Sequence, residues 1–418
     1  MASLELTGFE QARATILAAA RPLAPERLPL REALGRYLAD DIVASEPVPA
    51  VDNSAMDGFA VCSADTRGAA PDSPVALRLA GESRAGVPAA AGLAPGEAFR
   101  ISTGAVLPAG ADAVARVENT RIEEDTPPAV GEAGSGEKRI LIEAAVAPGH
   151  DVRRAGEDIR PAEVVLRAGT RVGPAELGVL ASLGAATVPC RRAPRLAVLT
   201  SGDELLEPGE AMRPGGVRNS NAYSVPALAQ EAGADVSVPP PAPDDPGATR
   251  AAIEPLLDRD VLVLCGGVSV GEHDHVKRAL AALGVAERFW RVALKPGRPT
   301  WFGTHGETLV FGLPGNPVSA MVTFLLFVRP ALVALGGGLP ERRRITARLA
   351  ADLQASPNRT QAIRCRLERR EDGWLARPTG AQASHVLTSM LGADCLAIVP
   401  PGGSPPRAGE RVEVELLA

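Results

Sequence analysis

The chain has 418 residues, of which 44 are basic and 50 acidic, so its formal net charge is −6. The length predicts two to four domains. The negative charge and an aromatic content of only 3% disfavour nucleic acid as a partner. The five cysteines are scattered without Cys-x-x-Cys spacing, which argues against a disulfide framework or a zinc knuckle. The N-terminus lacks a signal-peptide pattern and the longest strongly apolar run, 320–328, is short for a membrane span, so we expect a cytoplasmic protein without a membrane partner.

The N-terminal half combines two kinds of pattern. Residues 1–47 predict a helix, a short strand and a second helix, and residues 151–190 are again mixed, with an amphipathic helix near 173–183. We assign these two segments to one discontinuous mixed domain. Residues 48–150 show short β-type segments between Gly, Pro and Asp turns, which predicts a small all-β domain. Within it, residues 121–139 have the composition of a mobile surface loop.

From residue 195 the pattern changes to alternating strands and helices. This alternation predicts an α/β domain over 191–338, with a mostly parallel sheet and right-handed crossovers. The expected strands are 196–200, 235–238, 261–264, 289–294 and 308–311, and the expected helices are 222–232, 246–257, 275–283 and 317–335. A glycine-rich linker follows, and residues 339–418 predict a C-terminal β domain ending in a period-two strand.

Three glycine-rich loops lie between residues 261 and 320, and each follows an apolar segment. In an open α/β sheet such loops bring backbone N–H groups and helix N-termini to an anion at the carboxyl edge. The middle loop, Leu294-Lys-Pro-Gly-Arg-Pro299, adds the fixed positive charges of Lys295 and Arg298. The loops match neither the Walker pattern nor Gly-x-Gly-x-x-Gly. A phosphorylated ligand or another polyanion is the expected occupant.

Eight motifs follow one another in order along nearly the whole chain. They are Asp52-Asn-Ser-Ala-Met-Asp-Gly-Phe-Ala60, Ile101-Ser-Thr-Gly-Ala-Val-Leu-Pro108, Gly110-Ala-Asp-Ala-Val114, Gly156-Glu-Asp-Ile159, Thr200-Ser-Gly-Asp-Glu-Leu205, Cys265-Gly-Gly-Val-Ser-Val-Gly271, Lys295-Pro-Gly-Arg-Pro299 and Gly312-Leu-Pro-Gly-Asn-Pro-Val-Ser319. Together they closely resemble the MoeA family of molybdopterin molybdotransferases, to which the E domain of gephyrin belongs. The resemblance implies an elongated, four-domain homodimer. Its central α/β domain would be of the molybdopterin-binding type, and the small β domain of the other subunit would complete the cleft.

The resemblance also implies an activity. An enzyme of this family inserts molybdate into adenylylated molybdopterin and releases AMP and molybdenum cofactor, with a divalent metal that is usually Mg²⁺. Two alternatives stay open from the sequence. One is a non-catalytic, gephyrin-like dimeric scaffold that anchors a protein partner. The other is a molybdopterin adenylyltransferase, although such proteins resemble only the α/β domain.

Site residues carry over from the resemblance position by position. The catalytic residues would be Asp57, Thr103, Glu204 and Asp274. The substrate-binding residues would be Gly266, Gly267, Ser269, Lys295, Arg298, Pro299, Gly315, Asn316 and Ser319. Mg²⁺ prefers oxygen ligands and would be held by Asp274, Asn219 and Glu204. Asp274 could also cap the helix that is expected from residue 275.

Two of these positions depart from the family pattern. Arg298 stands where lysine is usual; it keeps the charge but prefers planar, bidentate partners. Asn219, in Arg218-Asn-Ser-Asn221, replaces an acidic residue. An asparagine offers a metal one carbonyl oxygen but no negative charge. We therefore expect weaker metal binding than an aspartate would give.

Overall fold

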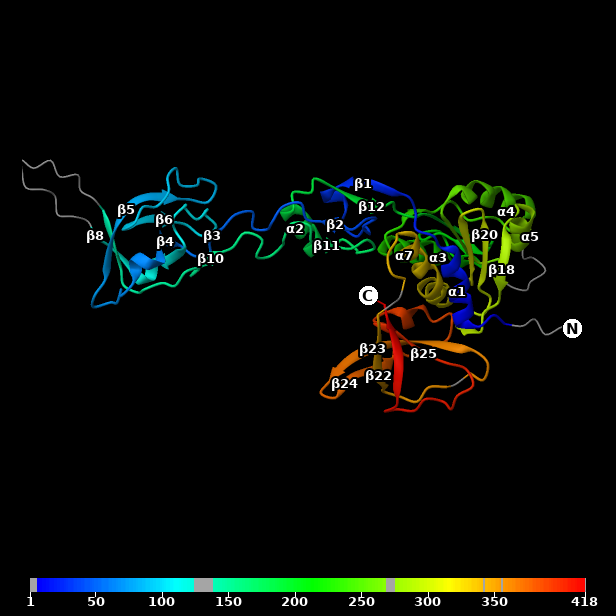
Figure 1. Cartoon of the computed structure of the whole chain (residues 1–418). Helices are drawn as coiled ribbons and strands as arrows, with labels where there is room; N and C mark the ends of the chain where they lie inside the picture. Colours follow the sequence, from blue (N-terminus) through cyan, green and yellow to red (C-terminus); the bar gives the residue numbers. More distant parts are fainter. Residues whose placement is uncertain (1–5, 124–137, 268–274, 341–342, 355, 418) are drawn as a thin grey trace, which may run out of the picture. The chain divides into compact units, whose positions relative to one another are not determined.

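The computed structural model describes residues 6–123, 138–267, 275–340, 343–354 and 356–417. Contacts divide the chain into two compact units (Figure 1). The first unit comprises residues 1–40, 168–177 and 187–418, and the second comprises residues 41–167 and 178–186. The boundaries predicted for four domains remain predictions.

The second unit is built around a six-stranded sheet with the order β7-β4-β6-β5-β9-β8. Its strands are β4 (Gly58–Val61), β5 (Val75–Ser83), β6 (Glu97–Ile101), β7 (Ala113–Arg116), β8 (Thr120–Glu123) and β9 (Arg139–Ile142). All neighbours are antiparallel except β5 and β6. Every strand falls within the segment for which a β domain was predicted. Most of the predicted loop at 121–139 lies outside the described residues, and β8 and β9 pair at its two ends.

Short antiparallel strand pairs join the segment before this sheet to the segment after it. In the second unit β2 (Ile42–Val43) pairs with β11 (Val164–Leu166), and β3 (Asn53–Ser54) pairs with β10 (Val152–Arg153). In the first unit β1 (Pro25–Pro29) pairs with β12 (Thr187–Arg191). Helix α2 spans Pro174–Ser182, close to the helix predicted near residues 173–183. The second helix predicted before residue 47 is only a 3₁₀ turn, Leu30–Glu32, because Pro29 precedes it and Gly35 follows at φ +79°.

The first unit contains a second six-stranded sheet with the order β16-β13-β17-β21-β20-β18. Its strands are β13 (Arg195–Thr200), β16 (Asp235–Ser237), β17 (Val261–Cys265), β18 (Ala286–Trp290), β20 (Trp301–His305) and β21 (Thr308–Leu313). The first four strands in this order are parallel to one another, as predicted. β20 runs antiparallel to both of its neighbours, β21 and β18. β20 was not predicted; it is a short strand that begins soon after Pro299 and has a glycine at its centre.

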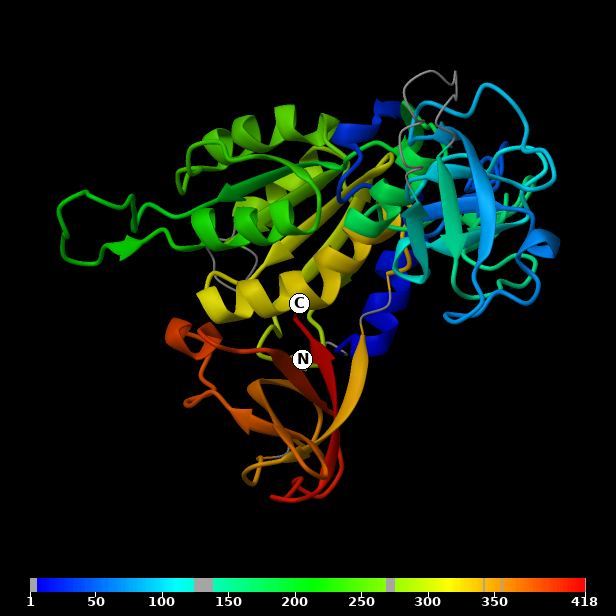
Figure 2. The same ribbon diagram turned by 90° about the vertical axis from the view of Figure 1, so that its left-hand side faces the viewer.

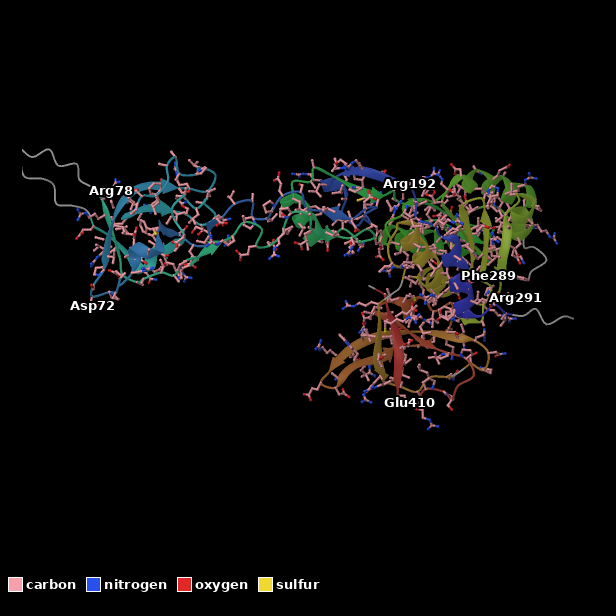
Figure 3. All side chains as sticks on the ribbon, in the orientation of Figure 1. Asp72, Arg78, Arg192, Phe289, Arg291 and Glu410 are labelled. Atoms are coloured by element: carbon pink, nitrogen blue, oxygen red, sulfur yellow. The ribbon has the colours of Figure 1, made fainter. Side chains whose placement is uncertain are left out.

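Helices cover both faces of this sheet (Figure 2). They are α1 (Phe9–Ala19), α3 (Asn221–Glu231), α4 (Pro246–Ile253), α5 (His275–Ala282), α6 (Pro317–Thr323) and α7 (Arg329–Leu335). Side chains of β13 alternate between the faces. Val198 packs with α1, α3, α6 and α7, and Leu199 packs with α4 and α5. On the first face Phe289, labelled in Figure 3, packs against Phe302 with ring centroids 5.6 Å apart.

The longest helix of this unit lies where it was predicted and is strongly apolar over its whole length. α6 continues through a π-helical turn, Phe324–Val328, into α7, so the helix runs from Pro317 to Leu335. Its mean hydropathy of 2.1 and its 19 residues would allow a membrane span by length and composition. However, 78% of that window is buried inside the molecule. A helix that is apolar on all sides is expected in a core, and this helix packs in the core of the α/β sheet.

The C-terminal segment forms a small barrel within the first unit. Its strands are β22 (Arg344–Leu349), β23 (Thr360–Arg370), β24 (Gly373–Pro378), β25 (Cys395–Val399) and β26 (Arg411–Leu416). β23 pairs with both β24 and β25, so the order β23-β24-β22-β26-β25 closes on itself. The short strand β19 (Leu294–Lys295) also pairs with β23. This pairing attaches the loop that carries Lys295 and Arg298 to the barrel.

Candidate active site

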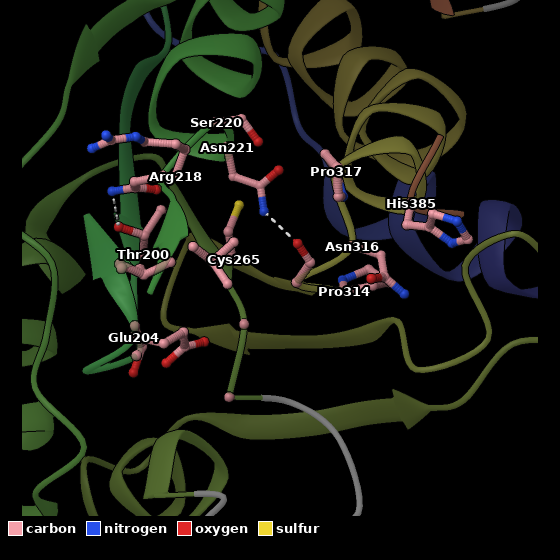
Figure 4. Close-up of a pocket in the computed structure, with 18 of the residues that line it drawn as sticks. Thr200, Glu204, Arg218, Ser220, Asn221, Cys265, Pro314, Asn316, Pro317 and His385 are labelled. Atoms are coloured by element: carbon pink, nitrogen blue, oxygen red, sulfur yellow. Dashed lines mark hydrogen bonds between the residues drawn. The ribbon is translucent and has the colours of Figure 1, made fainter. Parts of the chain in front are cut away.

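A cavity of about 760 Å³ lies at the carboxyl ends of the parallel strands; we call it the sheet-edge cavity. Thr200 ends β13 and Cys265 ends β17, and the loop after β21 supplies residues 314–317. β16 and β17 pair with opposite edges of β13, so the chain crosses to one side after β13 and to the other side after β16. Open α/β sheets bind their ligands at such a switch point. The barrel contributes His385 to the wall (Figure 4).

Glycines shape the floor of the sheet-edge cavity. Gly266 and Gly267 have φ values of +95° and +62°, which other residues rarely adopt. A Cβ atom on Gly267 would lie 2.4 Å from Cγ2 of Val276, so the α5 helix packs directly against this loop. The carbonyl of Gly315 accepts a 2.8 Å hydrogen bond from Nδ2 of Asn221, drawn as a dashed line in Figure 4. The first and third glycine-rich loops therefore meet here, as predicted.

Three acidic side chains lie in the loops that follow β13 and β16. Glu204 and Asp244 line the sheet-edge cavity, and Glu204 is exposed. Asp203 and Asp244 bind each other's backbone: Asp203 N–H donates to Asp244 at 3.3 Å, and Asp244 N–H donates to Asp203 at 3.2 Å. This exchange fixes one loop against the other and holds negative charge beside the cavity. Asp244 was not predicted as a site residue; it lies in a Pro- and Asp-rich loop.

Asn219 also lines the sheet-edge cavity, although only 2% of its surface is exposed. Its Nδ2 atom donates to Oγ1 of Thr200 and to Oε1 of Glu207, both at 3.1 Å. Its Oδ1 atom accepts a long, 3.4 Å bond from the N–H of Ala222 at the start of α3. Both amide protons are thus bonded within the protein, which leaves the oxygen as the atom available to a ligand.

The thiol of Cys265 lies at the wall of the same cavity (Figure 4). Burial raises the pKa of this thiol to about 12, because a thiolate would lose its hydration there. Cys265 is therefore a neutral thiol at physiological pH, and the thiolate is the nucleophilic form. Its side chain packs in the hydrophobic core on one face of the sheet.

A second cavity, of about 380 Å³, lies where the Lys295 loop meets the barrel; we call it the barrel cavity. Arg364 on β23 lines it and is completely buried. Its guanidinium donates to Oγ of Ser389 at 3.2 and 3.1 Å. Among the described residues, its Nη1 atom has no hydrogen-bond partner and no carboxylate lies within 4 Å. Burial lowers the pKa of Arg364 to about 10, so the group stays charged at neutral pH.

The loop with the two predicted cations runs between the two cavities. Lys295 is exposed and lines the barrel cavity with Arg364. Pro299, four residues later, lines the sheet-edge cavity. Arg298 is exposed, and its carbonyl accepts a 2.9 Å bond from Val292 that holds the loop. Of the two predicted cations, Lys295 thus lies at the barrel cavity, and Arg298 is not among the residues that line either cavity. One shared site for all three loops and both cations was expected from the sequence, and this expectation was wrong for Lys295.

In the second unit, two predicted catalytic residues bind each other. The Asp57 carboxylate accepts from the backbone N–H of Thr103 at 2.7 Å and from its hydroxyl at 3.0 Å. These bonds lower the pKa of Asp57, with the backbone bond contributing most. Asp57 is exposed, and none of the described cations lies within 4 Å of it. The pair therefore presents an ionised carboxylate and a threonine hydroxyl to solvent.

Most of the other predicted site residues gather at the sheet-edge cavity. They are Glu204, Asn219, Gly266, Gly267, Pro299, Gly315 and Asn316. Ser319 is instead 3% exposed within α6, where its carbonyl accepts a bond from Thr323. Ser269 and Asp274 lie outside the described residues. Within the part of the chain that the structure describes, no group of three or more His, Cys, Asp or Glu side chains could hold a metal ion.

Comparisons with known proteins agree along the whole chain. Residues 7–184 match the MoeA N-terminal region (domain I and II), residues 197–334 match a probable molybdopterin-binding domain, and residues 346–417 match the MoeA C-terminal region (domain IV). A molybdopterin molybdenumtransferase 2 from Mycobacterium tuberculosis is 35% identical, covering 96% of each chain. A molybdopterin molybdenumtransferase from Haemophilus influenzae is 34% identical over 94% of each. The crystal structure of a molybdopterin biosynthesis MoeA protein from Pyrococcus horikoshii has a TM-score of 0.81 at 31% identity, covering 99% of this chain and 100% of the other.

Proposed function

The chain belongs to the MoeA family, and we propose that it inserts molybdate into adenylylated molybdopterin, releasing AMP and molybdenum cofactor. The observation that carries this proposal is the match of all three family regions, in order, to a chain whose glycine-rich loops meet at one cavity. The protein is accordingly a transferase of molybdenum cofactor biosynthesis. The adenylyltransferase alternative is disfavoured because the N-terminal and C-terminal MoeA regions are both present.

The sheet-edge cavity is the proposed site for adenylylated molybdopterin. Its volume of about 760 Å³ is in the usual range for organic ligands of this size. The positive φ angles of Gly266 and Gly267 expose backbone next to the cavity, where a phosphate oxygen can approach closely. Asn316 and His385 close the side that faces the barrel. A backbone cradle of this kind suits the pyrophosphate that joins the two halves of the substrate.

The barrel cavity is the proposed entry site for molybdate. Molybdate is a tetrahedral dianion, and Lys295 and Arg364 together place two positive charges on the cavity wall. The guanidinium of Arg364 has no carboxylate counter-ion among the described residues, so its charge is not neutralised within the protein. A buried, unpaired charge is costly to keep and its field is weakly screened. An oxyanion in the cavity would supply the missing counter-charge.

Magnesium is proposed at the sheet-edge cavity. Glu204 offers a carboxylate and Asn219 offers an amide oxygen on the same wall, and such oxygens are the donors that Mg²⁺ takes. Asp274, the third predicted ligand, lies outside the described residues. When bound, the ion would neutralise charge on the pyrophosphate of the substrate. Glu204 and Asn219 would orient it and leave its other positions to water and phosphate oxygens.

A release assay tests the function directly. The protein would be incubated with adenylylated molybdopterin and Mg²⁺, with and without molybdate, while AMP is measured. We expect AMP release that depends on molybdate. We also propose that the chain works as a cytoplasmic homodimer, and light scattering at micromolar concentration should give twice the monomer mass. A folded dimer that releases no AMP under these conditions would favour the scaffold alternative.

A further inference from the structure

The amide of Asn219 belongs to a hydrogen-bond chain that the metal assignment does not use. Nδ2 of Asn219 donates to Oε1 of Glu207 at 3.1 Å, and Oε2 of Glu207 accepts from the hydroxyl of Tyr223 at 2.7 Å. Glu207 follows β14 (Leu205–Leu206), whereas Tyr223 is in the first turn of α3. Asn219 is thus bonded to the carboxylate of Glu207, which is twelve residues earlier in the chain.

The bonding partners decide which way the Asn219 amide points. A carboxylate only accepts hydrogen bonds, so Glu207 must face the NH₂ group of Asn219. The N–H of Ala222 only donates, so it faces the oxygen. A flipped amide would bring its oxygen against Glu207 and its NH₂ against the N–H of Ala222. Because Asn219 is 2% exposed, water could not relieve these contacts.

Glu207 is itself held in place by its own loop. The Arg218 side chain donates to the carbonyl of Glu207 at 2.7 Å and to the carbonyl of Glu210 at 2.6 Å. The Glu210 carboxylate accepts from the N–H of Glu207 at 3.0 Å. The backbone of Glu207 is therefore held in a braced turn, and its carboxylate is held by the bonds to Asn219 and Tyr223.

We propose that Glu207 is a positioning residue, which orients the Asn219 amide so that its oxygen is the atom left for the sheet-edge cavity. The same contact explains why a neutral residue stands at position 219. An aspartate there would bring a second carboxylate to about 3 Å from Glu207, where two groups that only accept hydrogen bonds would face each other without a donor between them. The part of the proposal that concerns magnesium rests on the proposed function; the coupling of the two side chains does not.

Exchanging the two groups tests the coupling. Asn219→Asp and Glu207→Gln would be made singly and together in the full chain. We expect each single variant to lower the melting temperature by at least about 3 °C. The double variant should recover most of the loss, because the amide at 207 can donate to the carboxylate at 219 while Tyr223 still donates to the amide oxygen. Glu231 is exposed at the end of α3, so Glu231→Gln removes one negative charge nearby and is the control for the loss of charge alone. Additive losses in the double variant would overturn the proposal.

A magnesium titration by calorimetry, with the metal alone, provides the readout that a purely structural role would not change. Glu207→Gln should weaken Mg²⁺ binding several-fold, because its amide no longer forces the Asn219 oxygen towards the cavity. The double variant moves a negative charge from 207 to 219 without changing the net charge, and should bind Mg²⁺ about tenfold more tightly than the parent. If stability shows the coupling but Mg²⁺ affinity is the same in every variant, Glu207 still positions Asn219, and the magnesium assignment in the proposed function is wrong.

Discussion

Asp57 and Thr103 come from separate motifs 46 residues apart, yet Thr103 donates to Asp57 through both its backbone N–H and its hydroxyl. Both donors favour the ionised carboxylate, which lowers the pKa of Asp57. Both residues were expected to be catalytic, and in the second unit they form one local hydrogen-bonded pair. The hydroxyl of Thr103 is therefore engaged with Asp57 whenever that carboxylate is ionised.

Removing the hydroxyl should raise the pKa of Asp57. In Thr103→Ala the backbone bond remains, and it makes the larger contribution, so the pKa should rise without reaching its ordinary value. Because the folded-state pKa is lowered, the stabilisation from this pair is present at neutral pH and is lost only as pH falls through that lowered pKa. Carboxyl NMR titration would measure the shift, with Ser102→Ala as the neighbouring control. An unchanged Asp57 titration in Thr103→Ala would show that the hydroxyl bond is not formed in solution.

We expect the charge of Arg364 to favour molybdate binding and to lower the thermal stability of the protein. Arg364→Met keeps much of the side-chain volume and removes a buried charge that lacks a carboxylate partner among the described residues. We expect unchanged or higher thermal stability, since replacing buried charge with apolar volume is often neutral or stabilising. The molybdate concentration at half-maximal AMP release should rise by tenfold or more. Lys295→Gln should cause a smaller rise that grows with salt, because Lys295 is exposed. Normal molybdate dependence in both variants would contradict the assignment of the barrel cavity.

The meeting of the glycine-rich loops could be predicted because it follows from strand direction. Parallel strands end at the same edge, and the register places Thr200 beside Cys265 and Cys265 beside Leu313. Any loops that follow these three residues must be neighbours. The sequence pattern therefore sufficed for the position of the sheet-edge cavity, and seven of its lining residues carried over from the family resemblance.

Arg364 and Glu207 could not be found in the same way, because their roles depend on contacts between distant segments. Arg364 alternates with apolar residues in a period-two strand, a pattern that normally indicates a solvent-facing side chain. It is buried because Ser389 and the carbonyl of Ala383 cover its guanidinium. Glu207 reaches Asn219 only because Arg218 folds the intervening loop back on itself. No local pattern encodes either contact.

We expect the contact between α1 and the barrel to contribute strongly to the free energy of unfolding. Arg13 donates to Glu415 at 2.8 Å, and the side chains are 10% and 1% exposed. Arg344 also reaches Glu415, at 2.9 Å, but is 41% exposed. Arg13→Met should therefore destabilise the protein by about 3 kcal/mol, since it removes a buried partner from a buried carboxylate, and Arg344→Met should cost clearly less. Urea unfolding followed by circular dichroism would compare the two. Equal losses would mean that burial does not decide the strength of these pairs.

Cysteine reactivity should follow burial. All five cysteines are unpaired, and only Cys62 is partly exposed. Burial raises the pKa of Cys265 to about 12, so its reactive thiolate should form only well above physiological pH. Treating the native protein with iodoacetamide at pH 7.5 should modify Cys62 alone, and the modification should be mapped by peptide mass spectrometry. All five should react in denaturant. Rapid modification of Cys265 in the native protein would show that the wall of the sheet-edge cavity opens to solvent.

Two glycines with similar backbone angles provide a final, matched comparison. Gly267 and Gly284 have φ values of +62° and +77°, so alanine at either position meets the same backbone strain, about 1 kcal/mol. At Gly284 a Cβ atom would meet nothing within 4 Å, whereas at Gly267 it would lie 2.4 Å from Cγ2 of Val276. Because Val276 is buried in α5, it cannot move aside without shifting that helix. Gly284→Ala should therefore keep normal AMP release with a slightly lower melting temperature. Gly267→Ala should lose further stability and most of its activity, because the loop beside the sheet-edge cavity must move. If both variants behave alike in calorimetry and in AMP release, close packing of α5 against the loop does not shape the cavity.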